Sequence, residues 1–389
     1  MQPLGSLPTK IWYAAYLLYD DFTTARAAGS VNGTSAEPVG GVRTVVDTNN
    51  KISIANGLLR FATGEVAFDR LYYDVQLRVL GKSFLVNVMP ANALGGAQLG
   101  WDNNTVGTLT SCIRLAIGDI SILSNAAVIV VGTHTATPYQ FCVTLRATGN
   151  FFFIKGGAFT NWVMLFADSL LSGNMYPTIS TYLTTAIYDA DGARIPKRLY
   201  IPVPLQSDGF SASTTDGLGN PENNGTVGNS YSDVGTWGVT GGKRACSALS
   251  GGVGFSYLAC SSTDVLIDAT CTRTAGVTGI VARYADASNY LIAYHDGTNC
   301  KLDKVVAGVT TNLISAAATY SATAVLRLVL DGTAARLFYN NAAVGTVATT
   351  PTAGSLNHGL YTTDVNATFD NFIVWARGTG GEYSGLDTL

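Results

Sequence analysis

Acidic residues are the first place to look for chemistry, because hydrolysis of a glycosidic bond uses two carboxyl groups that flank it. Asp189 and Asp191 would share one side of a strand, but Asp191 is followed by Gly192, and Asp-Gly is a turn signal. No Gly-x-Ser-x-Gly motif in a strand–turn–helix context supports a nucleophilic serine. The glutamates are too far apart in the sequence to form a pair: Glu37, Glu65, Glu222 and Glu382. We therefore expect no enzymatic activity.

Aromatic residues in the second half of the chain could recognise a sugar. Arg283 and Tyr284 end one predicted strand, and Tyr290 and Tyr294 lie on the next. Aromatic rings beside hydrogen-bonding groups suit a binding surface, so we take these four as candidate carbohydrate-binding residues. Trp101 lies in a Gly/Asn-rich, loop-like stretch and is the fifth candidate, as an exposed aromatic. The alternatives are ordinary half-buried packing, since tyrosine is a favoured strand residue, or a protein interface.

The elements that would position these residues belong to a chain with few charges. Charged residues make up 13%, against about 25% in an average soluble domain. The apolar runs are far shorter than the roughly 20 residues of a membrane-spanning helix, and the net charge of −3 offers no basic footprint for nucleic acid. We therefore expect surfaces that are buried between copies or against partner proteins. The alternative is a hydrated surface of Ser, Thr, Asn and Gly.

Alternation of apolar and polar residues dominates the sequence and predicts half-buried antiparallel strands. Examples are residues 71–79, 265–271 and 324–330. Asn56-Gly57 between two short runs predicts a tight hairpin over residues 52–62. For residues 161–171, a short helix and a buried strand remain open. The fold class is therefore all-β.

A loose internal repeat divides the chain. Asp20-Asp21-Phe22 and Asp208-Gly209-Phe210 each open a unit, and an Asn-Gly-Thr loop follows each of them. Each loop leads to a predicted strand pair, 42–47 with 51–54 in the first unit and 236–239 with 244–248 in the second. The predicted parts are an apolar N-terminal arm (1–19), a first sandwich (20–193), a proline-rich linker (194–206) and a second sandwich (207–389).

The six cysteines contain no CxxC pair, which argues against zinc-ribbon and thioredoxin-type sites. Disulfide pairing within each half is one interpretation. We favour buried free thiols, because domains of this size rarely need disulfides.

Several motifs of the second half follow one another in a recognisable order: Gly279–Tyr284, Asn289–Tyr294, Leu326–Gly332, Ala335–Asn341 and Phe369–Val374. In this order, residues 207–378 resemble the concanavalin A-like lectin/glucanase sandwich in its laminin-G-like branch. The first half is similar through Asp20–Phe22, the 56–57 hairpin and Val143–Gly149. The resemblance implies two tandem antiparallel jelly-roll β-sandwiches. The junction from Arg194 to Phe210 resembles linkers in structural proteins of tailed-phage particles.

The resemblance also carries expectations about metal and function. In related modules an acid on the closing strand helps to hold a structural Ca²⁺, which makes Asp370 the metal candidate here, with Asp208 as a second ligand. The alternative is an Asp that supports strand pairing or contacts Arg377. We expect a non-enzymatic structural protein of an extracellular particle, such as a phage virion, which forms homo-oligomers or binds other virion proteins and contacts glycans. The alternatives are a secreted or cell-surface carbohydrate-binding protein and a glycoside hydrolase.

Overall fold

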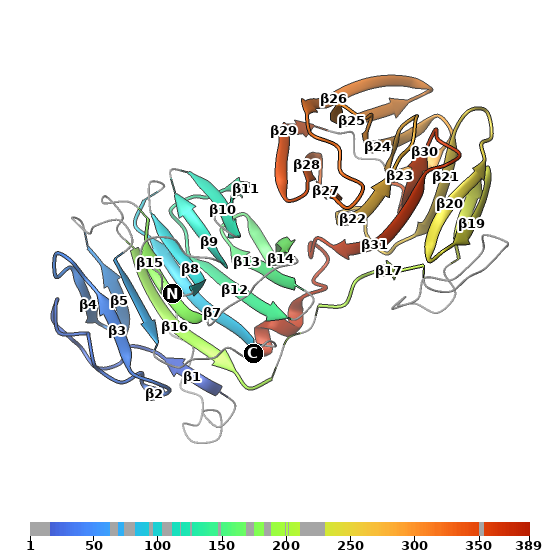
Figure 1. The fold of residues 1–389 in the computed structure, drawn as a ribbon. Helices are drawn as coiled ribbons and strands as arrows, with labels where there is room; N and C mark the ends of the chain where they lie inside the picture. The colour runs from blue at the N-terminus through green and yellow to red at the C-terminus, as the bar shows by residue number, and fades with distance from the viewer. Residues whose placement is uncertain are drawn as a thin grey trace. The chain divides into compact units, whose positions relative to one another are not determined.

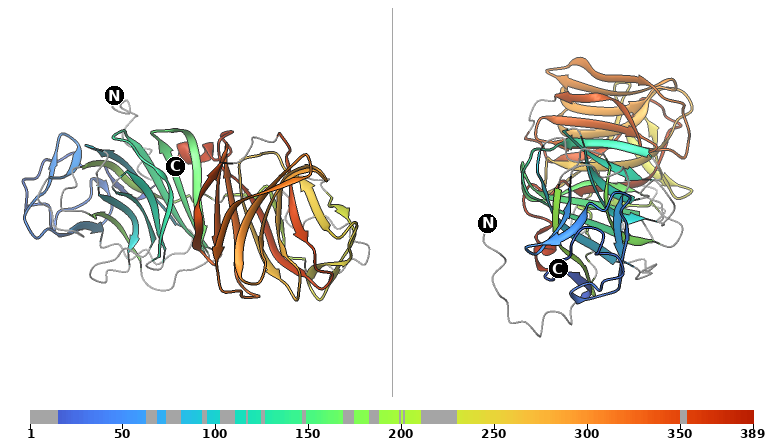
Figure 2. Two further views of the ribbon diagram at one scale, coloured as in Figure 1. Left: turned by 90° about the horizontal axis from the view of Figure 1, so that it is seen from above. Right: turned by 90° about the vertical axis from the view of Figure 1, so that its left-hand side faces the viewer.

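The computed structural model divides the chain into two compact units (Figure 1). Unit 1 contains Met1–Ile201 together with Gly381–Leu389, and unit 2 contains Pro202–Gly380. The strands of each unit form stacked layers (Figure 2). The structure describes residues 16–62, 69–73, 82–92, 96–102, 111–116, 118–124, 127–146, 149–168, 175–182, 188–198, 200, 202–210, 230–349 and 354–389.

Unit 1 consists of two antiparallel sheets. The nine-stranded sheet has the order β14 (Phe159–Asp168), β13 (Gly149–Gly156), β12 (Tyr139–Arg146), β7 (Lys82–Pro90), β16 (Tyr188–Pro196), β1 (Tyr16–Asp20) and β2 (Pro38–Val39), with the hairpin β4 (Ile52–Ala55) and β5 (Leu58–Phe61) joined to β16. The seven-stranded sheet has the order β11 (Ala127–Thr133), β10 (Asp119–Ser124), β9 (Ser111–Ala116), β8 (Ala97–Asp102), β15 (Tyr176–Thr181), β6 (Arg70–Tyr73) and β3 (Arg43–Val46).

Unit 2 is built in the same way. Its eight-stranded sheet has the order β19 (Thr236–Thr240), β20 (Lys243–Ala248), β31 (Thr368–Ala376), β22 (Val265–Thr272), β27 (Val325–Asp331), β28 (Ala334–Tyr339) and β29 (Ala342–Thr349), with β17 (Gln206–Asp208) also paired to β31. Its seven-stranded sheet has the order β18 (Ser232–Val234), β21 (Gly254–Ala259), β30 (Asn357–Thr362), β23 (Thr278–Asp286), β24 (Asn289–His295), β25 (Asn299–Val306) and β26 (Val309–Ala317).

The two units share one topology, which confirms the all-β prediction of two tandem antiparallel sandwiches. The seven-stranded sheets match strand for strand, from β11 with β26 to β3 with β18. In the other sheets β1 corresponds to β17, β16 to β31, and the hairpin β4–β5 to β19–β20. Strand β3 corresponds to the short β18 and β4 to β19. The predicted pair of 42–47 with 51–54 is wrong, because β3 pairs with β6 and β4 with β5, whereas the predicted pair of 236–239 with 244–248 is the hairpin β19–β20. Strand β2 has no counterpart among the described strands of unit 2.

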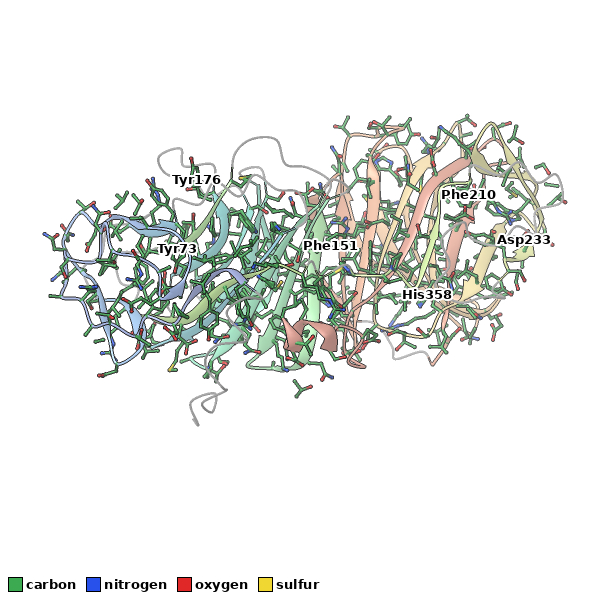
Figure 3. The ribbon with its side chains drawn as sticks, turned by 90° about the horizontal axis from the view of Figure 1, so that it is seen from below. Tyr73, Phe151, Tyr176, Phe210, Asp233 and His358 are labelled. Carbon is green, nitrogen blue, oxygen red and sulfur yellow. The ribbon has the colours of Figure 1, made fainter. Side chains whose placement is uncertain are left out.

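The Asp-x-Phe motif that opens each repeat has the same geometry twice. Oδ1 of Asp20 accepts a hydrogen bond from the amide of Phe22 at 3.1 Å, and Oδ1 of Asp208 accepts one from Phe210 at 2.8 Å. Both phenylalanines adopt a left-handed backbone, with φ of 52° and 53°. This region is strained for a bulky residue. The hydrogen bond from the phenylalanine amide to the aspartate stabilises the turn against this strain (Phe210 is labelled in Figure 3).

The environments of these two aspartates differ in their arginines. Tyr73 and Tyr231 each donate a hydroxyl hydrogen bond to the aspartate of their own unit, at 3.0 and 3.2 Å. In unit 1, Arg43 is fully buried and contacts both oxygens of Asp20 at 2.7 Å. In unit 2, Arg244 binds Asp233 instead and lies 4.7 Å from the ring centroid of Tyr231.

Several local expectations can be compared with the strands. Asn56 and Gly57 have φ of 55° and 74° and join β4 to β5, as the hairpin prediction requires. Residues 159–168 form strand β14, which settles the helix-or-strand alternative. Asp189 and Asp191 were interpreted as turn residues, and this was wrong, because both lie inside β16 at the edge of a bulge. All six cysteines are buried and free.

The last residues of the chain pack in unit 1, whereas the expected second domain ran to residue 389. Oδ1 of Asp387, in the 3₁₀ turn Ser384–Thr388, accepts hydrogen bonds from Lys155 Nζ at 2.7 Å and Trp162 Nε1 at 2.9 Å. Tyr383 and Leu386 are buried at 2% and 0% exposure. Unit 1 is thus discontinuous in sequence, and the tail is part of its structure.

The N-terminal arm proposed from sequence falls mostly outside the described residues, which begin at Tyr16. Tyr16–Asp20 form β1, which pairs with β16 and β2 of the same unit. Within the described parts of the chain, no helix is long and apolar enough to cross a membrane.

Candidate functional site

The outer face of the seven-stranded sheet of unit 2 carries a second apolar cluster, separate from the core between the sheets. Alternation along β24 turns Leu291 and Ala293 into the core and leaves Tyr290, Ile292 and Tyr294 on the other side. Neighbouring strands add further rings to that side. We call this surface the aromatic face, and its rings are Phe255, Tyr257, Tyr284, Tyr290, Tyr294 and Tyr361.

A bulge in β23 explains why Tyr284 belongs to the aromatic face and Arg283 does not. Arg283 has φ of 49°, and the pairing with β24 shifts register after Ala282. Its side chain is 1% exposed, and Nη2 donates to Asp264 Oδ1 at 3.0 Å and to the carbonyl oxygen of Gly332 at 2.8 Å. The prediction of Arg283 as a carbohydrate-binding residue is therefore corrected, because its guanidinium is buried and forms hydrogen bonds within unit 2.

Ring contacts hold the aromatic face together around Phe255, which is 1% exposed. Its centroid lies 5.0 Å from Tyr284, 5.1 Å from Tyr290 and 5.3 Å from Tyr361. Tyr257 contacts Tyr284 at 4.3 Å. Such offset and edge contacts add stability beyond area burial. Tyr257, Tyr290 and Tyr294 remain half-buried, so they present ring surface to solvent on a fixed base.

Two glycines interrupt the aromatic rows. Gly279 lies between Tyr361 and Tyr294 in the cross-strand register, and Gly359 lies between Tyr257 and Val281. A Cβ at Gly279 would stand 1.9 Å from the carbonyl oxygen of Ala293. A side chain therefore cannot be added there without moving the backbone, and the tyrosines flank bare main chain on which a flat ligand could rest.

Polar groups border the face at β24 and β25. Tyr294 donates its hydroxyl to Asp303 Oδ2 at 2.7 Å, and Asn312 Nδ2 donates to Asp303 Oδ1 at 2.6 Å. Burial, followed by the hydrogen bond to Asp303, raises the pKa of Tyr294 well above its usual value. Burial likewise raises the pKa of Tyr290. These phenols therefore stay neutral at physiological pH. The single proton of the Tyr294 hydroxyl is donated to Asp303, so toward a ligand this oxygen acts as an acceptor.

Of the other two predicted sites, Trp101 is corrected by the structure. Trp101 is 0% exposed, and its Nε1 donates to the carbonyl oxygen of Val143 at 3.0 Å inside unit 1, so it is a core residue. Asp370 Oδ1 accepts the amide of Asn371 at 2.8 Å. Both oxygens of Asp208 accept protein donors. Among the described residues no group of three His, Cys, Asp or Glu side chains could hold a metal. Backbone carbonyls supply many ligands of calcium sites, and Asp370 as a calcium ligand stays a prediction.

A pocket of about 330 Å³ lies elsewhere in unit 2, near the ends of β26 and β29. Its walls are mainly alanines and backbone. The hydroxyl of Tyr339, which lines it, is already bonded to the amide and carbonyl of Ser321. The pocket thus lacks the convergent polar groups that a specific site requires.

Sequence reasoning found three rings of the aromatic face and missed Phe255, Tyr257 and Tyr361. The alternation Phe255-Ser256-Tyr257 was a usable signal, because it places both rings on one side of β21. Their proximity to Tyr290 arises only from the strand order β21-β30-β23-β24, which no local pattern contains.

No protein-family model and no curated protein sequence matches the chain. Among solved structures, it is similar to the carbohydrate-binding module CBM66 from Bacillus subtilis, with 18% identity, 38% of this chain and 95% of that chain covered, and a TM-score of 0.32. The exoplasmic/lumenal domain of VIP36 in its Ca²⁺/Man2-bound form has 10% identity, coverage of 49% and 90%, and a TM-score of 0.34. Xylan β-1,4-xylosidase from Bacillus halodurans C-125 has 10% identity, coverage of 90% and 88%, and a TM-score of 0.30. Likenesses this low do not say what the chain binds.

Proposed function

We propose that the protein is a non-enzymatic carbohydrate-binding protein, and that the aromatic face of unit 2 is its binding surface. The observation that carries the proposal is the set of half-buried tyrosines packed against the buried cluster around Phe255 and separated by bare backbone. Exposed rings present flat apolar surface to the apolar face of a sugar ring, and their hydroxyls can bond its hydroxyl groups. A rigid base lowers the entropy lost on binding.

A glycan panel tests the proposal, followed by titration calorimetry of any hit. The double variant Tyr290→Ala/Tyr294→Ala should weaken binding at least tenfold, because both rings lie on β24 and are half-buried, so that they present ring surface to solvent. Val365→Ala is the matched control, since Val365 is 45% exposed between β30 and β31, outside the aromatic face. Binding that survives the double variant would refute this choice of surface.

We also propose that the protein acts as a structural subunit of an extracellular assembly, with a phage virion as the setting that the linker resemblance suggests. Support comes from the low charge content and from uncharged edge strands. Val309 on β26 is 66% exposed and Val347 on β29 is 53% exposed, and neither strand contains a charged residue. Unprotected edges of this kind are prone to pair with other chains. Light scattering at micromolar concentration should give an oligomer, and a monodisperse monomer would count against this proposal.

One observation favours a glycoside hydrolase as the competing function. Asp189 and Asp191 lie on the same side of β16, and burial raises the pKa of both carboxyl groups. Asp189 forms an ion pair with Arg60 at 3.6 Å. If the pair is catalytic, the protein releases reducing sugar from a glycan substrate and Asp191→Asn abolishes that release. A blank result across a broad panel would dismiss the hydrolase.

A further inference from the structure

The seven-stranded sheet of unit 1 carries polar side chains on the face that is aromatic in unit 2. Ala97, Leu99 and Trp101 of β8 point into the core, so Gln98 lies on the other face. The same argument places Arg114 of β9 outside, between the core residues Ile113 and Leu115. Cross-strand register joins these residues into one line over β6, β15, β8, β9 and β10. We call it the arginine row: Arg70, Ser180, Gln98, Arg114 and Ser121.

Gln98 is at the centre of the arginine row and has unmet hydrogen-bonding capacity. It is 0% exposed. Within the part of the chain that the structure describes, neither Oε1 nor Nε2 has a hydrogen-bond partner. A buried amide without partners is destabilising, and native proteins rarely retain one unless water or a ligand supplies the missing bonds. Gln98 therefore points to something that binds there.

Arg114 is the direct cross-strand partner of Gln98, and its side chain is also buried without all of its hydrogen-bond partners. It is 8% exposed, and its guanidinium carbon lies 4.0 Å from the ring centroid of Tyr182. Among the described ion pairs and hydrogen bonds it has no carboxylate partner, and Nε has no acceptor. A nearly buried cation that lacks a counter-charge is costly to the fold. It favours a ligand that brings a negative charge.

The other end of the arginine row adds a second cation and more aromatic surface. The Arg70 guanidinium lies 6.0 Å from the ring centroid of Tyr72, and Tyr72 contacts Tyr176 at 5.6 Å (Tyr176 is labelled in Figure 3). Three strand spacings separate Arg70 from Arg114, which is about 14 Å. This length accommodates more than one sugar unit. Asp102 shares the face at 2% exposure and already makes an interaction within the protein.

We propose that the arginine row binds an acidic saccharide, a glycan whose sugar units carry a carboxylate. Arg114 pairs with the carboxylate, which it can grip with two parallel N–H bonds. Gln98 donates to and accepts from the neighbouring hydroxyls, and the rings of Tyr182 and Tyr72 hold the guanidinium groups in place. This site is independent of the aromatic face of unit 2, so either can exist without the other.

Calorimetry with the full chain tests the proposal, using oligogalacturonate and a sialyl oligosaccharide as probes. Cello-oligosaccharide is the neutral comparison, and inorganic phosphate and sulfate are the simple anions. We expect an acidic probe to bind and Arg114→Met and Gln98→Leu to weaken it at least tenfold, whereas the Tyr290→Ala/Tyr294→Ala variant binds it as before. Arg26→Met is the matched control, because Arg26 is a 36% exposed arginine of unit 1 outside the row.

A stability measurement separates a binding role from a structural one. If Arg114 is kept for a ligand, Arg114→Met removes an uncompensated charge, and the melting temperature of the ligand-free protein should stay level or rise. A marked fall would mean that Arg114 supports the fold, and would overturn the proposal. Binding of phosphate as tight as that of the saccharides, or no acidic saccharide bound at all, would also overturn it.

Discussion

Units 1 and 2 place corresponding strands in the same order, and the outer faces of their seven-stranded sheets nevertheless differ in chemistry. Across five matched strands, unit 1 carries Arg70, Ser180, Gln98, Arg114 and Ser121, whereas unit 2 carries Phe255, Tyr361, Gly279, Tyr294 and Lys301. The backbone decides which residues line up in a row, and the side chains decide what the row can bind. A duplicated sandwich can in this way hold two unlike surfaces.

The largest expected difference in stability between the units comes from their buried arginines, Arg43 in unit 1 and Arg244 in unit 2. Arg43→Met leaves Asp20 fully buried without its cation, so unit 1 should lose about 3–5 kcal/mol of unfolding free energy. Arg244→Met should destabilise unit 2 by less, because the Asp233 side chain is 13% exposed and keeps some water. Hydrogen exchange with mass detection in graded urea follows each unit separately. Equal losses would remove this distinction between the units.

Deletion of residues 381–389 should act on unit 1 and spare unit 2. The deletion removes the buried side chains of Tyr383 and Leu386 and leaves Trp162 without the Asp387 acceptor. We expect unit 1 to lose about 3–6 kcal/mol, from two buried side chains at roughly 1.5–3 kcal/mol each. The same exchange experiment reports it. Faster exchange in the strands of unit 2 instead would contradict the assignment of the tail.

Acid should weaken unit 2 through His358, which is fully buried. Burial lowers the pKa of His358 to about 4, from an ordinary value of 6.5. Between these two pH values the unfolded chain takes up a proton that the folded chain refuses, so stability falls as the pH falls and levels off below pH 4. The integrated loss is about 3 kcal/mol. Urea titrations from pH 7 to 4 measure it, and His358→Asn should flatten the slope.

The smallest effect concerns Tyr294 in the aromatic face. Tyr294→Phe keeps the ring and removes the hydroxyl donated to Asp303, so unit 2 should lose about 1 kcal/mol. Glycan affinity should fall by only a few fold if the ring makes the main contact. A loss as large as that of the alanine variant would assign the binding to the hydroxyl.

Periodicity in the sequence was enough to predict the strands β22 and β27, the hairpin at Asn56-Gly57 and the duplication that begins at Asp20 and Asp208. Most of the strand predicted at 71–79 lies outside the described residues. Periodicity could not predict that the Arg283 side chain lies off the aromatic face. The left-handed residue at the bulge reverses the alternation, and no sequence pattern indicates the bulge. Trp101 was misjudged because its Gly/Asn-rich surroundings resemble a loop, while the residue itself ends a buried strand.

The sequence pattern did not predict the arginine row, for a related reason. Gln98 and Arg114 are 16 positions apart, and their pairing depends on the register of β8 with β9. An isolated Gln or Arg in an alternating strand is typical of a solvent-exposed face. Gln98 and Arg114 are candidates for binding because they are buried and lack hydrogen-bond partners. Burial and missing partners are properties of the folded unit and not of the sequence.

The place of the tail has a consequence for the order of events during synthesis. Residues 202–380 leave the ribosome before Tyr383 and Leu386, and domains generally fold as units while the chain emerges. Unit 2 can therefore complete its sandwich while the last piece of unit 1 has not yet been made. The half of the molecule that is translated first is the half that is finished last.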